Sequence, residues 1–567
     1  MGTGLGGLKM RTIAAIGAMA VLGAFAPSMT QADGKPDFGL LAIHSLCIAP
    51  AADGGGQVIA PAAKLLAGYG SGGFRIHTSE PRAQAFFDNG IQLGHAFAHK
   101  DSIAAFKEAR RLDPDCAMCA WGEAWARGPT INYTINDKTQ AELAALAAKA
   151  WDLSRNSSEV ERGLIAALKL RYAHGGGAGI GDYAYADAMD KLARAHPGDS
   201  EIAILAADAW MIPASQKNNQ QNLPRAMELI QGVLAREPAN SAAIHFYIHV
   251  TEMSGVGARA LPYAETLQGL APQASHLVHM PSHTYFWVGE YQKAVASNLE
   301  AAVLDEADAR RSGEVDGWDR YYYGHNVQFG MGGALMSGDA ANGLKLAQNT
   351  LSHVARGPGN PAFAQMARST ALFVQGRFED PARMMAQAEP DQPLLRAMWR
   401  YARGEAAART GDARAVRAEA DRVSISDADL KPFGEFKSQV KSMVEVARLV
   451  LQGRAAMVDN RPLAAAPLFR KAAEIQEKSF VTFTDPPVWW YPPRRSLAAA
   501  ELAAGQPDNA AQEAREVLKH WPRDPMSLEV LAEAERKLGK VADADRDLAL
   551  ARKGWRGDPA SMGLAMI

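Results

Sequence analysis

The histidines of this 567-residue chain are unevenly placed, and five of its fourteen lie within 39 residues. They form two runs, at residues 244–249 and 275–283. The five are His245, His249, His276, His279 and His283. Imidazole is the commonest metal ligand and changes charge near neutral pH, so a cluster of this density is either a coordination site or a costly structural choice.

The elements that must position these histidines are predicted to be helical hairpins. Beyond residue 77, Ala, Leu, Glu and Arg dominate, apolar residues recur at spacings of three and four, and alternating β-branched runs are scarce. A 34-residue ruler with small or apolar residues at positions 20, 24 and 27 and proline at position 32 fits several segments. This is the tetratricopeptide (TPR) pattern. The expected fold is all-α, a right-handed α-solenoid of TPR-like helical hairpins.

The ruler turns the two histidine runs into a spatial prediction. With Pro238 and Pro272 at position 32, the next repeats begin at Ser241 and Ser275, and a spacing of four places two histidines of each run on one helix face. Equivalent helices of a solenoid lie side by side at roughly 10 Å. Two facing pairs are therefore expected in the concave groove, namely His245 with His279 and His249 with His283.

Further residues extend this candidate metal site. Glu252 lies on the same face one turn beyond His249, where it either ligates a metal or orients an imidazole by accepting its second N–H. His276, at position 2 of its repeat, completes or orients the ligand set. A groove wall that would restrict water is predicted from Trp287, Tyr322, His325 and Gln328.

Two functions follow from this groove. The first is binding of a transition metal, with copper favoured and zinc or iron as alternatives, because imidazole suits all three. If the ion keeps an open position, oxidative chemistry on a small organic substrate follows, and the chain is a candidate metal-dependent oxidoreductase whose catalytic residues the sequence does not identify. The alternative is a TPR scaffold with structural histidines that binds a peptide or protein. Peptide-binding grooves tend to offer Lys, Arg and Asn, whereas this groove offers His.

A second constellation contains sulfur. Cys116 and Cys119 flank Met118 at the start of a predicted helix, and His99 lies on the preceding hairpin. The helix dipole favours thiolate there, and soft sulfur ligands suit Cu(I). A structural disulfide or two packed thiols explain the same pattern. Ala120 follows Cys119 where attachment of c-type haem would require histidine.

Composition and targeting signals restrict the setting. The formal charge of −2 and the pI near 6.7, with no dense basic run, argue against a nucleic-acid partner. Residues 1–32 resemble a cleavable signal peptide, which predicts a periplasmic or secreted protein without a transmembrane segment in the mature chain. A Gly/Ala/Pro-rich lead-in at 33–77 precedes two predicted arrays, at 78–340 with the histidine cluster and at 341–567.

An ordered set of motifs across residues 78–555 resembles a group of exported bacterial TPR proteins. The motifs are Asp-Pro-Asp-Cys-Ala-Met-Cys-Ala-Trp-Gly at 113–122, Gly-Pro-Thr-Ile-Asn at 128–132, His-Phe-Tyr-Ile-His-Val-Thr-Glu at 245–252, Ser-His-Leu-Val-His-Met-Pro-Ser-His-Thr-Tyr at 275–285, Tyr-Tyr-Gly-His-Asn at 322–326 and Pro-Pro-Val-Trp-Trp-Tyr-Pro at 486–492. The resemblance implies the α-solenoid fold and marks the five clustered histidines as shared positions. Members of the group often read His-Asn-x-His-Phe where this chain has Gln328, which puts a ligand from that repeat in doubt.

Overall fold

The computed structural model describes residues 63–173, 180–217, 220–353, 361–480 and 487–558, together with Met1 and Met562. The chain divides into two units, Met1–Asp37 and Phe38–Ile567, and the second contains every element discussed below. The predicted signal peptide at 2–32, most of the lead-in and Cys47 lie outside the described residues. Export therefore stays a prediction.

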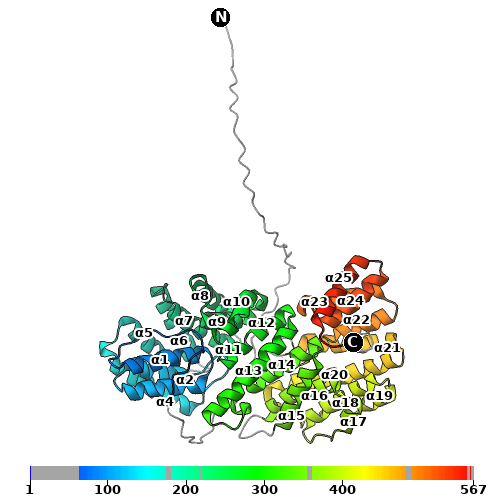
Figure 1. Cartoon of the computed structure of the whole chain (residues 1–567), viewed down its shortest axis with the longest axis horizontal. Helices are drawn as coiled ribbons and strands as arrows, with labels where there is room; N and C mark the ends of the chain where they lie inside the picture. Colours follow the sequence, from blue (N-terminus) through cyan, green and yellow to red (C-terminus); the bar gives the residue numbers. More distant parts are fainter. Residues whose placement is uncertain are drawn as a thin grey trace. The chain divides into compact units, whose positions relative to one another are not determined.

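The described regular structure is helical, and successive helices pair as hairpins from α1 to α25 (Figure 1). The first thirteen helices are α1 (Pro81–His95), α2 (His99–Leu112), α3 (Ala117–Ala126), α4 (Asp137–Leu153), α5 (Glu159–Ala173), α6 (Ile180–Ala195), α7 (Ser200–Lys217), α8 (Leu223–Arg236), α9 (Ser241–Met253), α10 (Leu261–Leu270), α11 (Ser275–His279), α12 (Pro281–Val288) and α13 (Tyr291–Ser312). The others are α14 (Tyr323–Ser337), α15 (Ala340–Ser352), α16 (Pro361–Phe378), α17 (Pro381–Ala386), α18 (Pro393–Arg409), α19 (Ala413–Ala420), α20 (Lys437–Val458), α21 (Pro462–Ser479), α22 (Arg494–Ala503), α23 (Pro507–His520), α24 (Pro525–Lys537) and α25 (Val541–Gly554). Short 3₁₀ helices are η2 (Ser154–Asn156), η3 (Gln220–Asn222), η4 (Gly257–Ala260), η5 (Gly317–Asp319) and η6 (Lys431–Phe436). The all-α solenoid of TPR-like hairpins is confirmed.

The predicted repeat starts are also confirmed where the histidines lie. Helix α9 begins at Ser241, after Asn240 caps it by accepting a hydrogen bond from the Ala243 amide. The next repeat begins at Ser275, one 34-residue period later. Its first helix is interrupted, because Pro281 has no backbone N–H to donate into the preceding turn, and the segment becomes α11 followed by α12.

The hydrophobic core runs across the predicted array boundary at 340/341. Leu335 and Met336 on α14 belong to the same buried cluster as Leu346 and Ala347 on α15. This cluster continues along the chain to Ala500, so nearest-neighbour packing of helices links the two predicted arrays. The boundary itself stays a prediction.

The last hairpin also packs far from its neighbours in sequence. Trp555, just after α25, lies against Gly338, where an added Cβ would come within 2.5 Å of the indole ring. The Arg556 amide donates to the Ser337 carbonyl at 2.7 Å, and its guanidinium lies 3.5 Å from Asp339. Gly338 therefore combines a left-handed turn, with φ of 72°, and a close approach that only glycine permits.

None of the helices in the described part of the chain combines the length and apolar character that crossing a membrane requires.

Candidate metal centre

Six buried histidines form two sets of three, each close enough to hold one metal ion. The first triad is His245, His249 and His276, and the second triad is His279, His283 and His325. In the first triad, the Nε2 atom of His245 lies 3.0 Å from that of His249 and 3.1 Å from that of His276. In the second, the Nε2 atom of His279 lies 2.8 Å from that of His283 and 3.0 Å from that of His325.

Four helices supply these side chains. Helix α9 provides two histidines one turn apart to the first triad, and α14 provides His325 to the second. His276 and His279 lie one turn apart on α11 but belong to different triads, with ring centroids 5.8 Å apart. The rings of His249 and His283 come within 6.0 Å across the same boundary. The two triads therefore adjoin.

The predicted pairing between repeats is wrong in detail. His245 was expected to face His279, and His249 to face His283, whereas the Nε2 atoms of each i,i+4 pair meet one another. Imidazoles one turn apart on a helix reach each other directly, which leaves the third position of each set to another helix. His276 takes that position in the first triad, and His325 takes it in the second instead of serving as a groove wall.

The proton positions in the second triad follow from the outer nitrogens. The Nδ1 atom of His279 donates to Asn298 Oδ1 at 2.6 Å, and the amide orientation is set because Asn298 Nδ2 donates to the Ala294 carbonyl at 2.7 Å. The Nδ1 atom of His283 donates to the Glu252 carboxylate at 2.8 Å. Neutral imidazoles with protonated Nδ1 atoms carry a bare lone pair on each Nε2. Two such lone pairs then face each other at 2.8 Å.

In the first triad the outer contact is a backbone carbonyl. His245 Nδ1 donates to the carbonyl oxygen of His95 at 2.7 Å, so its Nε2 lone pair also points into the triad. The His95 ring in turn contacts Glu201 through its Nε2 atom. Such outer acceptors fix the tautomer and orientation of metal-binding imidazoles.

The electrostatics keep these imidazoles neutral. Burial lowers the pKa of His245 to about 3. Burial, reinforced by the neighbouring imidazoles, also holds the pKa values of His249, His276, His279 and His325 well below the ordinary value. The neutral form is the one that coordinates a metal ion, so both triads are in the binding form at neutral pH.

Two phenylalanines that the sequence analysis missed enclose the triads. Phe97 stacks on His276 at 4.9 Å between ring centroids and meets His245 edge-on at 4.5 Å. Its φ of 54° is in the left-handed region, which non-glycine residues rarely adopt and which tends to mark functional sites. Phe329 lies 4.6–5.1 Å from all three rings of the second triad. Phe329, one turn after His325, carries a sequence signal, whereas Phe97 carries none.

The predicted wall residues divide. Tyr322 stacks on His276 at 4.4 Å between ring centroids, as a wall residue would. Trp287 packs instead against Gly257 on η4. Gln328 is buried and donates to Thr370 Oγ1 at 3.3 Å, outside both triads. Because His325 completes the second triad without it, glutamine at position 328 does not remove the ligand from this repeat.

The proposed sulfur site is not formed. Cys116 and Cys119 are joined in a disulfide, so neither offers a thiolate to a metal. Met118 is buried in the hydrophobic core. His99 lies among aromatic rings, 5.1 Å from Phe97 and 5.3 Å from Tyr133 between ring centroids. Of the two readings left open for the cysteines, the structure supports the disulfide.

The contact between Glu252 and His283 supports the orienting role for this carboxylate, and the groups that could hold an ion do not include it. We therefore expect Glu252→Gln to weaken copper binding at the second triad about 10–100-fold without losing the site, because the amide oxygen is a weaker acceptor. Competition with a chelator measures the affinity. Glu265→Gln, at a half-exposed carboxylate paired with Lys293, is the matched control. Complete loss of one ion would instead identify Glu252 as a ligand.

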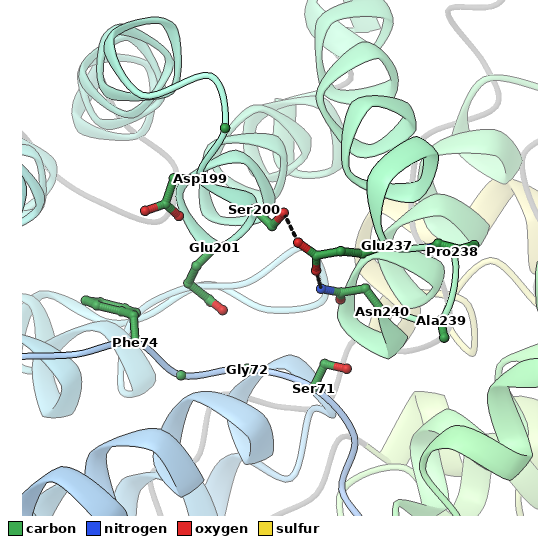
Figure 2. Close-up of a pocket in the computed structure, with 12 residues that line it drawn as sticks. Ser71, Gly72, Phe74, Asp199, Ser200, Glu201, Glu237, Pro238, Ala239 and Asn240 are labelled. Carbon is green, nitrogen blue, oxygen red and sulfur yellow. Dashed lines mark hydrogen bonds between the residues drawn. The ribbon is translucent and has the colours of Figure 1, made fainter.

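A separate open cleft of about 650 Å³ contains none of the triad histidines (Figure 2). Its wall is acidic, with Asp199, Glu201 and Glu237 among the lining residues. Glu237 accepts hydrogen bonds from Ser200 Oγ and Asn240 Nδ2. Glu201 also contacts His95, which places this cleft one residue away from the outer contact of the first triad.

No protein-family model and no curated protein matches the chain. Solved structures of other proteins are similar to it over most of its length. A human IFIT1 dimer with m7Gppp-AAAA has 11% identity and a TM-score of 0.30, with 84% of this chain and 91% of that chain covered. The P58(IPK) TPR domain has 12% identity, a TM-score of 0.20 and coverages of 81% and 98%. The Cut9–Hcn1 hetero-tetramer of the APC/C has 12% identity, a TM-score of 0.23 and coverages of 86% and 96%. At these TM-scores the likeness supports no statement about ligand or activity.

Proposed function

We propose that this TPR-like solenoid is an exported protein that binds two copper ions, one in each histidine triad. The observation that carries the proposal is the 2.8 Å contact between the Nε2 atoms of His279 and His283, each of which donates its Nδ1–H to a fixed acceptor. Two bare lone pairs at this distance repel, and a shared cation turns the repulsion into coordination. A buried histidine cluster without a cation would have no such compensation.

The donor set favours copper over the alternatives. Each triad offers three imidazole nitrogens and no thiolate, a set that suits copper, zinc and iron. Divalent copper binds a given nitrogen site more tightly than zinc or iron does. Export supports the choice only indirectly, because it removes the protein from intracellular control of metal supply.

Three protein ligands per ion favour reactivity over a purely structural role. Structural zinc sites are closed by four ligands, whereas catalytic sites keep a position open for water or substrate. Two adjoining triads would place two open positions near one another, as in two-metal active sites. We therefore propose that the protein is a copper-dependent oxidoreductase that uses dioxygen to oxidise a small organic substrate. Oxygen consumption by the copper-loaded protein in the presence of candidate substrates tests this step.

Elemental analysis tests metal binding itself. Protein purified from its native export compartment is expected to contain about two copper ions per chain, one for each triad. A His245→Ala/His279→Ala double variant removes the central ligand of both triads and is expected to contain almost none. Unchanged, sub-stoichiometric metal in both proteins would contradict the proposal. A doubly protonated His283, the other way to satisfy the 2.8 Å contact, predicts that result.

One observation favours the alternative function, a scaffold that binds a peptide or protein. The cleft in Figure 2 is open, has a volume of about 650 Å³ and has an acidic wall suited to a basic peptide. Under this alternative the purified protein is metal-free, and the double histidine variant folds and binds its partner as the wild type does. The elemental analysis therefore separates the two functions.

A further inference from the structure

A small cavity of about 60 Å³ adjoins the first triad. It holds about five water molecules, or a compact organic molecule of similar size. His276 lines it, so the cavity reaches a triad histidine, while the exposed side chain of Lys100 lies at its outer end. It is distinct from the acidic cleft, with which it shares no lining residue.

One side of this cavity is aromatic. Phe97 and Tyr322 line it with ring planes 22° apart and centroids separated by 6.1 Å, and both rings lie against His276. His99 and Tyr321 extend the same side. Aromatic faces of this kind pack favourably against a planar, largely apolar body.

The other side carries charges that are already paired. Arg320 lies 3.1 Å from Asp101 and 3.0 Å from Glu314, and Lys100 pairs with Glu314. Asp308 accepts hydrogen bonds from the Tyr69 hydroxyl at 3.0 Å and from Arg311 at 2.7 Å. No cation that lines the cavity is left to neutralise an incoming anion, so an uncharged ligand is favoured.

Two polar groups remain for such a ligand. Asp305 is buried and accepts one hydrogen bond from Asn326 Nδ2 at 2.9 Å, and burial raises the pKa of its carboxyl to about 7. At neutral pH this carboxyl therefore either donates or accepts a hydrogen bond. The Nδ1 atom of His276 is buried and has no hydrogen-bond partner among the described residues. With its Nε2 atom directed into the triad, that Nδ1 carries a proton that requires an acceptor.

We propose that this cavity binds a small neutral phenol, with the ring along Phe97 and Tyr322 and the hydroxyl between Asp305 and His276. A phenolic oxygen accepts from the imidazole N–H, while its own hydrogen is donated to the carboxyl. The role of the phenol as the substrate of the copper centre rests on the proposed function, whereas its binding does not.

Calorimetric titration of metal-free protein with phenol and with benzoate tests the proposal without copper. Phenol is expected to bind with a Kd of about 1 mM or lower, and benzoate at least about tenfold more weakly, because its carboxylate would meet Asp305 and Asp308. Ala98→Leu, which fills the cavity from its lining, is expected to abolish phenol binding. Ala148→Leu, on the exposed side of α4, is the matched control and is expected to bind as the wild type does.

A second variant keeps the test decisive if Ala98→Leu folds poorly. Asp305→Asn removes the negative charge and is expected to bring the affinities for phenol and benzoate within about twofold of each other. Absence of phenol binding by the wild type, phenol binding that survives Ala98→Leu in a folded protein, or equal wild-type affinity for benzoate would overturn the proposal. If phenol binds as expected but the purified protein lacks copper, the proposed function fails and the cavity assignment stands.

Discussion

A His279→Ala variant is expected to hold about one copper ion per chain where the wild type holds two, because only one of the two triads loses a ligand. His279 is the centre of the second triad, with its Nε2 atom 2.8 Å from His283 and 3.0 Å from His325. Without it, only two imidazoles remain. Loss of an outer hydrogen bond to a ligand costs about 10–100-fold in metal affinity, and loss of the ligand itself is expected to cost more than 100-fold.

Elemental analysis combined with chelator competition measures this change. His245 occupies the equivalent central place in the first triad, so His245→Ala is expected to give the reciprocal loss. His520→Ala removes an exposed histidine outside both triads and is the matched control, with two ions retained. If His279→Ala and His520→Ala contain the same amount of copper, the second triad is not a copper site.

The repeat architecture could be predicted from sequence because its signals are local. Ser241 and Ser275 begin repeats in the structure as the proline ruler predicts, and Gly338 is the turn between α14 and α15. Caps, prolines and left-handed glycines act within one turn of the residues that they terminate. The return of Trp555 onto Gly338 had no such signal, because the two residues are far apart in the chain.

The membership of the site was largely predictable, but its grouping was not. Helical spacing places His245 with His249 and His279 with His283, yet nothing local shows that His276 turns toward one pair while His279, one turn later, belongs to the other. His325 joins from 46 residues beyond His279, and that contact depends on how α14 packs. Phe97 reaches the site from a loop between α1 and α2, through a backbone conformation that no residue type indicates.

Asp305→Asn is expected to stabilise the protein at alkaline pH and to leave its stability unchanged near pH 4. The ordinary pKa of an aspartate in an unfolded chain is about 3.9, and burial raises that of Asp305 to about 7. The folded state therefore retains a proton that the unfolded state releases. The stability that this proton contributes is fully present below about pH 3.9 and is lost as the pH rises through about 7.

The loss amounts to about 1.4 kcal/mol per pH unit over roughly three units, or about 4 kcal/mol above pH 8. Asparagine resembles the protonated carboxyl and still accepts from Asn326, so the variant avoids this loss. Urea unfolding of metal-free protein at pH 4.5 and 8.5 measures the difference, with Asp427→Asn, at an exposed aspartate, as the matched control. Equal effects of Asp305→Asn at both pH values would mean that Asp305 is already ionised in the folded protein. The carboxyl would then have no proton to donate to a ligand in the cavity.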